Sequence, residues 1–132
     1  MIDILVDSDK TVSFEIYFGT GKDGEFKVSS DLSDVSSDEE IVTHTIEMKS
    51  PNYKDGVSIA SLAVTTDGST MKIDPSVARY ERFVLLLKSW TFVDVDGNPI
   101  PANRDSIDKL NPEIAMVIMD KVDDILSWIV VH

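Results

Sequence analysis

The apolar residues of this chain change their spacing about halfway along it. In residues 12–18 and 41–48 apolar and more polar side chains alternate, which is typical of strands with one buried face. In residues 77–87 and 114–129 apolar side chains recur every three or four positions, which is typical of amphipathic helices. The order of these patterns predicts an α+β fold, with a small N-terminal antiparallel β-sheet followed by a three- to four-helix C-terminal half.

Turn signals and an acidic segment divide the strand-rich part. A short apolar run at residues 2–6 predicts a first strand. The glycine-rich segment 19–24 predicts a hairpin turn, with 25–29 as the returning strand. Residues 29–40, SSDLSDVSSDEE, hold only two apolar residues. We therefore expect a solvated loop there, and we expect deletion of residues 31–40 to change stability little.

Two helices of the second half have clear start signals. Asp74-Pro75 and Asn111-Pro112 each place a capping residue before a proline at the first helical position. The first of these helices is expected to end near Trp90, and the second to run towards the C-terminus. Phe83, Leu87 and Trp90 lie on the apolar stripe of the first helix, so we expect them to be buried against the last helix.

Two further helical segments are predicted with weaker signals. The first covers residues 52–64 and ends at the polar segment 65–69. Its apolar face is expected to consist of Tyr53, Val57, Ala60 and Val64. The second is a helical turn within residues 103–110. Between the long helices, Asp96-Gly97 is a pair typical of tight turns.

The chain of 132 residues has the length of a single domain, 1–132, with a strand-rich part at 1–50 and a helical part at 51–132. No apolar run approaches the roughly 20 residues of a membrane span. The acidic start of the chain is unlike a signal peptide. The lack of cysteine excludes disulfides and thiolate metal sites. These features predict a cytosolic protein without a membrane partner.

The net charge of −12, from 24 acidic and 12 basic residues, argues against nucleic acid as a partner. Binding to a phosphate backbone needs clustered lysine and arginine. The nearest approach to such a cluster is Arg79, Arg82 and Lys88, which Glu81 interrupts. The acidic surface is expected to keep the protein solvated, or to favour a basic partner.

The residues that could carry chemistry do not form a recognisable catalytic pattern, so we expect no enzyme activity and no cofactor. The two histidines, His44 and His132, lie in a predicted strand and at the end of the chain. Asp94, Asp96 and Asn98 are spaced like calcium ligands. A calcium loop needs glycine at its sixth position, however, and this chain has Pro99 there. A turn capped by aspartate explains these residues better, and a small calcium-binding module is the weaker alternative.

The second half of the chain contains several short motifs in a definite order. A helix ends in a tryptophan at residues 79–90, "Asp-x-x-Gly-x-Pro-x-Pro" follows at 94–101, and "Ile-x-x-Leu-x-Pro" follows at 107–112. This order resembles that of the tail assembly chaperones of tailed bacteriophages, and residues 45–55 are similar to the strand that leads into the family's first helix. The resemblance covers roughly residues 41–128, whereas the strand-rich first 40 residues depart from the largely helical members.

This resemblance implies a non-enzymatic protein that acts in the host cytoplasm. Such chaperones bind the tape measure protein and tail tube proteins during tail morphogenesis. The departure of the first 40 residues leaves a second hypothesis, a structural virion component such as a baseplate, tail or neck protein.

A chaperone needs an apolar surface that its own fold leaves open, and two segments of the chain are candidates. One is the side of the residue 77–90 helix that lies off its main stripe, and the other is the apolar C-terminus. These surfaces are also expected to mediate self-association. The partner-binding residues predicted in this way are Leu85, Leu86, Trp128, Ile129, Val130 and Val131.

Overall fold

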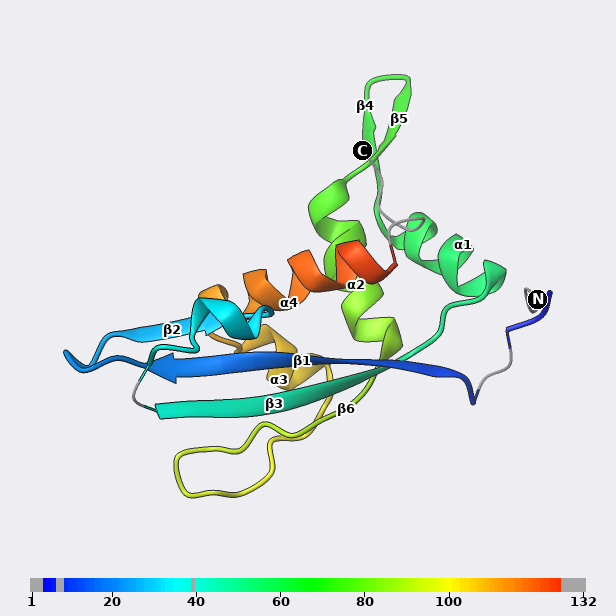
Figure 1. Cartoon of the computed structure of the whole chain (residues 1–132). Helices are drawn as coiled ribbons and strands as arrows, with labels where there is room; N and C mark the ends of the chain where they lie inside the picture. Colours follow the sequence, from blue (N-terminus) through cyan, green and yellow to red (C-terminus); the bar gives the residue numbers. More distant parts are fainter. Residues whose placement is uncertain (1–3, 7–8, 39, 127–132) are drawn as a thin grey trace.

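The computed structural model describes residues 4–6, 9–38 and 40–126, and it has the predicted α+β architecture. An antiparallel sheet of four strands forms its centre, in the order β2-β1-β3-β6 (Figure 1). The strands are β1 Thr11–Thr20, β2 Phe26–Ser29, β3 Glu40–Lys49 and β6 Leu87–Trp90.

The described residues form four α-helices, all of which come after β3 in the chain. They are α1 Tyr53–Leu62, α2 Pro75–Leu86, α3 Arg104–Asp108 and α4 Pro112–Ile125. Each begins after an Asn or Asp whose side chain accepts hydrogen bonds from main-chain N–H groups of the first turn. The predicted starts at Asp74-Pro75 and Asn111-Pro112 are confirmed, and so is the short helix within 103–110.

The long pair β1–β3 buries one face against the helices. Phe14 lies opposite Ile46 in the ladder, and both are buried. Because side chains alternate along a strand, Ile16 and Met48 lie on the same face and are also buried. This face forms one core with residues of α1, α2 and α4. They include Ile59, Ala63, Phe83, Leu86, Ile118 and Val122.

Three features of the second half differ from the sequence prediction. The first is the face that α1 buries: Tyr53 and Val57 are exposed, whereas Ile59 and Ala63 are buried. A buried acidic residue, Asp55, begins this stripe. Burial acts to raise the pKa of the Asp55 carboxyl, but hydrogen bonds from Lys49 Nζ and the Asn52 N–H outweigh it and lower the pKa below its ordinary value. Because these partners stabilise the buried carboxylate, α1 can place the face that bears Asp55 and Ile59 against the core.

The second difference is a hairpin where only a break in the helix was expected. Strands β4 Val64–Asp67 and β5 Thr70–Ile73 pair across a two-residue turn and extend away from the main sheet (Figure 1). Gly68 has a φ of +64°, which favours glycine at such a turn.

The third difference is the end of α2, which stops at Leu86 rather than near Trp90. The chain continues directly into β6, where Trp90 lies opposite Ile46 of β3. The open edge of β3 offers main-chain hydrogen bonds to this segment, and these outweigh its helical spacing. Phe83 is buried as expected, whereas Leu87 and Trp90 are half-buried on a strand.

The first half also departs from the prediction in two places. In the apolar run at 2–6, the described residues 4–6 form no strand, and Ile4 and Leu5 are exposed. The acidic segment is irregular apart from the short 3₁₀ helix η1, Leu32–Asp34. Its Val35 is fully buried, so the expectation of a wholly solvated loop is wrong at that position. A Cβ at Gly19 would lie 2.9 Å from Val35 Cβ, which shows how closely this segment packs on β1.

Replacing Val35 by alanine is expected to lower the free energy of unfolding by about 2 kcal/mol, because it removes two buried methyl groups and leaves a cavity. The matched control is Leu32→Ala in the same segment, where the side chain is 48% exposed. It should change stability by less than about 0.5 kcal/mol. Urea unfolding followed by circular dichroism measures both, and equal effects would contradict this account.

Candidate functional site

The structure separates the two predicted partner-binding residues of α2. Leu85 is 42% exposed, in keeping with a surface position. Leu86 is fully buried, so the expectation that it faces outward is wrong. It lies one helical turn after Phe83 and shares the stripe that faces the core. The other predicted residues, Trp128, Ile129, Val130 and Val131, lie outside the described residues.

The two leucines give a direct test of this assignment. Leu86→Ala is expected to destabilise the fold by about 2–5 kcal/mol, because it creates a core cavity. Leu85→Ala should cost less than about 1 kcal/mol, because most of the removed surface is in water in the folded state. Comparable unfolding midpoints for the two variants would show that the helix is rotated from the position described.

An apolar pocket of about 380 Å³ opens between strands β1 and β3 on one side and the chain that follows β6 on the other. Three rings line it, those of Phe18 on β1, His44 on β3 and Phe92 just after β6. The opposite wall comes from the segment that follows and from the start of α4. Its aliphatic residues are Ile100, Leu110 and Ile114. The pocket is within the usual size range of ligand sites, roughly 300–1,000 Å³.

Contacts between aromatic rings hold the walls of this pocket in place. The ring of Phe92 stacks on that of Phe18 at 5.9 Å between centroids, and it also contacts His44 and Trp90 at 5.0 Å each. Trp90 Nε1 donates a hydrogen bond to the Ile100 carbonyl at 2.6 Å. The sheet and the segment after it are therefore fastened together on both sides of Phe92.

His44 contributes an uncharged ring to the pocket. Its Nδ1 lies 3.1 Å from Thr91 Oγ1, within hydrogen-bonding distance. Burial lowers the pKa of His44 below its ordinary value, so the imidazole is neutral at pH 7. The ring then adds to an apolar lining rather than supplying a charge.

The predicted turn at Asp94-Asn98 is confirmed. Asp94 Oδ1 accepts hydrogen bonds from the N–H groups of Asp96 and Asn98, both at 2.9 Å. Gly97 has a φ of +82°, as a tight turn requires. The Asp94 carboxylate is thus used by its own turn. Within the described residues, no group of three or more histidine and acidic side chains could hold a metal ion.

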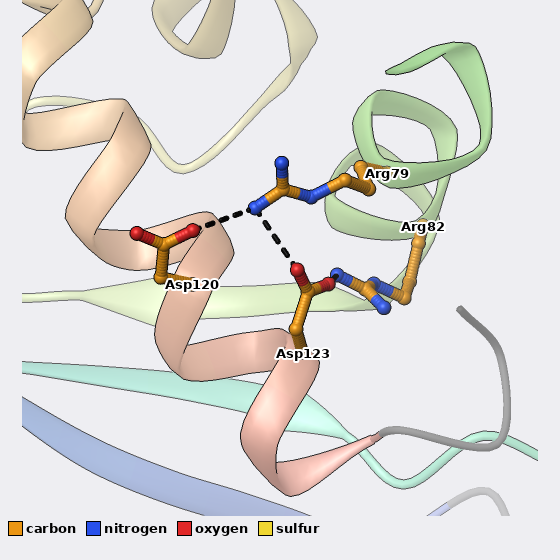
Figure 2. Close-up of polar contacts among 4 residues, drawn as sticks. All are labelled: Arg79, Arg82, Asp120 and Asp123. Carbon is orange, nitrogen blue, oxygen red and sulfur yellow. Dashed lines mark hydrogen bonds and ion pairs between the residues drawn. The ribbon is translucent and has the colours of Figure 1, made fainter. Parts of the chain in front are cut away.

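A second polar cluster joins α2 to α4, as Figure 2 shows. Arg79 Nη2 lies 3.0 Å from carboxylate oxygens of both Asp120 and Asp123. Arg82 is 1% exposed and also pairs with Asp123. Two guanidinium groups and two carboxylates balance in charge, so the cluster is a clamp between helices rather than an open anion site.

The clamp predicts unequal effects of its two acids. Asp123→Ala should cost about 3–5 kcal/mol, since it leaves the buried Arg82 cation without a counter-charge. Asp120→Ala should cost less than about 1 kcal/mol, because the Asp120 side chain is 70% exposed. Equilibrium unfolding of both variants is the measurement, and a loss for Asp120→Ala as large as that for Asp123→Ala would refute the assignment.

Comparison with protein-family models, curated proteins and solved structures finds no match for this chain. Among the helices of the described residues, none combines the length and the apolar character needed to span a membrane.

Sequence reasoning did not find the pocket. Its lining residues lie on four separate segments. Within its own segment, each apolar lining residue is spaced like an ordinary core residue. The sequence signal that could have indicated the pocket was Phe92. This aromatic residue lies between Trp90 and a predicted turn, and the apolar spacing of the predicted 77–90 helix does not explain it.

Proposed function

We propose that this protein is a non-enzymatic binding protein that acts as a tail assembly chaperone of a tailed bacteriophage. The observation that carries the proposal is the apolar pocket framed by Phe18, His44 and Phe92. An open pocket lined by rigid aromatic rings is suited to an apolar side chain of a partner. The ordered motifs at residues 79–112 supply the resemblance to the chaperone family.

The surface around the pocket also supports a protein partner. Phe26 on β2 is 44% exposed and meets Phe18 edge to face at 5.5 Å, so the apolar surface continues across β1 to β2. Val93, on the other side, lines the pocket and is 50% exposed. Contiguous exposed apolar groups of this kind are typical of interaction sites. The net charge of −12 favours a client with basic segments.

In this function the protein binds the tape measure protein or tail tube proteins in the host cytoplasm before the tail polymerises. The test is co-expression with the tape measure and tail tube proteins of the same phage, followed by affinity purification and mass spectrometry. At least one of them should copurify, and mature virions should lack the protein. Its presence in washed virions would favour a structural virion component instead, and failure of both tail proteins to copurify would reject the proposal.

Two valines on one hairpin allow a matched test of the pocket. Val93→Asp places a carboxylate in the lining and should reduce client recovery about tenfold, because an apolar partner group would leave that charge unpaired. Val95→Asp adds the same charge two residues away, at a side chain that is fully exposed and not part of the lining. It should leave recovery unchanged. Equal losses for both variants would point to a general charge effect rather than to the pocket.

A further inference from the structure

Strand β3 has an edge that is only partly used. On the side away from β1, strand β6 pairs with Ile46, Glu47 and Met48. Beyond these pairs, Thr91 bonds to Thr45 of β3. The Thr91 N–H donates to the Thr45 carbonyl at 3.1 Å, and Thr91 Oγ1 accepts from the Thr45 N–H at 3.0 Å. The chain then turns away as the hairpin around Asp96-Gly97 (Figure 1). Within the described part of the chain, no strand pairs with residues 40–44 on this side.

The direction of the main-chain groups along this edge follows from Thr45. Both its N–H and its C=O point towards the β6 side. Along a strand, the residues that direct their main-chain groups to one side alternate with those that direct them to the other. Thr43 and Ile41 therefore present their N–H and C=O groups to the open edge, whereas Val42 and His44 direct theirs to β1. An edge of this kind is a template for another strand.

The open edge lies directly beside the apolar pocket. His44 belongs to both, since it is part of the unpaired stretch and lines the pocket. Its side chain, like that of Val42, lies on the helix-facing side of the sheet, as the buried Ile46 does. A strand added to this edge would place every second side chain on that same side, next to Phe92 and Val93. One such side chain would enter the pocket.

The charges around this edge favour a basic segment. Glu40 lies at the start of β3, and Asp94 and Asp96 lie on the hairpin that leaves the edge, all three exposed. The cation among the pocket residues, Lys109, is already paired with Asp105 at 3.2 Å. An incoming peptide with lysine or arginine beside its apolar anchor would thus meet exposed acidic groups.

We infer that β3 binds an extended client segment by strand addition at residues 40–44, with one aromatic or large aliphatic side chain in the pocket and basic residues flanking it. This inference deepens the proposed function and rests on it for the identity of the client. Main-chain hydrogen bonds to Ile41 and Thr43 would give affinity, and the pocket would select the anchor.

The experiment selects short peptides from a displayed random library on the purified protein, so it does not depend on tail proteins. The selected peptides should share one aromatic or large aliphatic residue with flanking lysine or arginine. Thr43→Pro removes an N–H that faces the open edge without touching the β1 ladder, and it should weaken peptide binding about tenfold, as the loss of one main-chain hydrogen bond implies. Thr43→Ala keeps the N–H and should bind within about twofold of the parent.

Amide hydrogen exchange of the unaltered protein decides the matter if Thr43→Pro does not fold. Peptide binding should slow exchange at Ile41 and Thr43 more than at Val42, whose N–H already faces β1. Selection of no peptides, or of acidic ones, would overturn the inference, and so would equal binding by the proline and alanine variants. If basic peptides bind at this edge but tail proteins do not copurify, strand addition stands and the proposed function fails.

Discussion

The pairing of β1 with β3 is the constraint on which the rest of the fold depends. Its ten-residue strands hold Phe14 opposite Ile46, and this register puts the apolar side chains of both strands on the face that meets the helices. A slip by one residue would turn that whole set towards solvent. Buried residues of α1, α2 and α4 form one core with this face, so the strand register also determines which surface the helices cover. The Arg82–Asp123 pair then fixes α2 against α4.

Local signals in the sequence were sufficient for most helix starts and for the long strands. A capping residue followed by proline acts within one turn, so Asp74-Pro75 and Asn111-Pro112 could be read without knowledge of the fold. The alternation in residues 12–18 and 41–48 likewise depends only on one face being buried. The same holds for the turn at Asp94, whose side chain bonds to its own loop.

Features that depend on distant partners could not be read in the same way. Residues 87–90 continue a helical spacing, and only the edge of β3 makes them a strand. Val35 looks like a stray apolar residue in a polar segment, and its burial requires the small surface of Gly19. The buried stripe of α1 begins with an acidic residue that pairs with Lys49, so hydrophobic spacing pointed to the wrong face. The pocket combines four segments, and no single segment reveals it.

The direct junction of α2 and β6 has a mechanical consequence. No loop residue separates Leu86 from Leu87, so this joint has no slack. A rotation or translation of α2 is passed on to the strand that carries Trp90 and, two residues later, to Phe92. The ring of Phe83 on α2 also contacts that of Trp90, with 6.4 Å between centroids, so the position of α2 and that of the aromatic wall beside the pocket depend on each other.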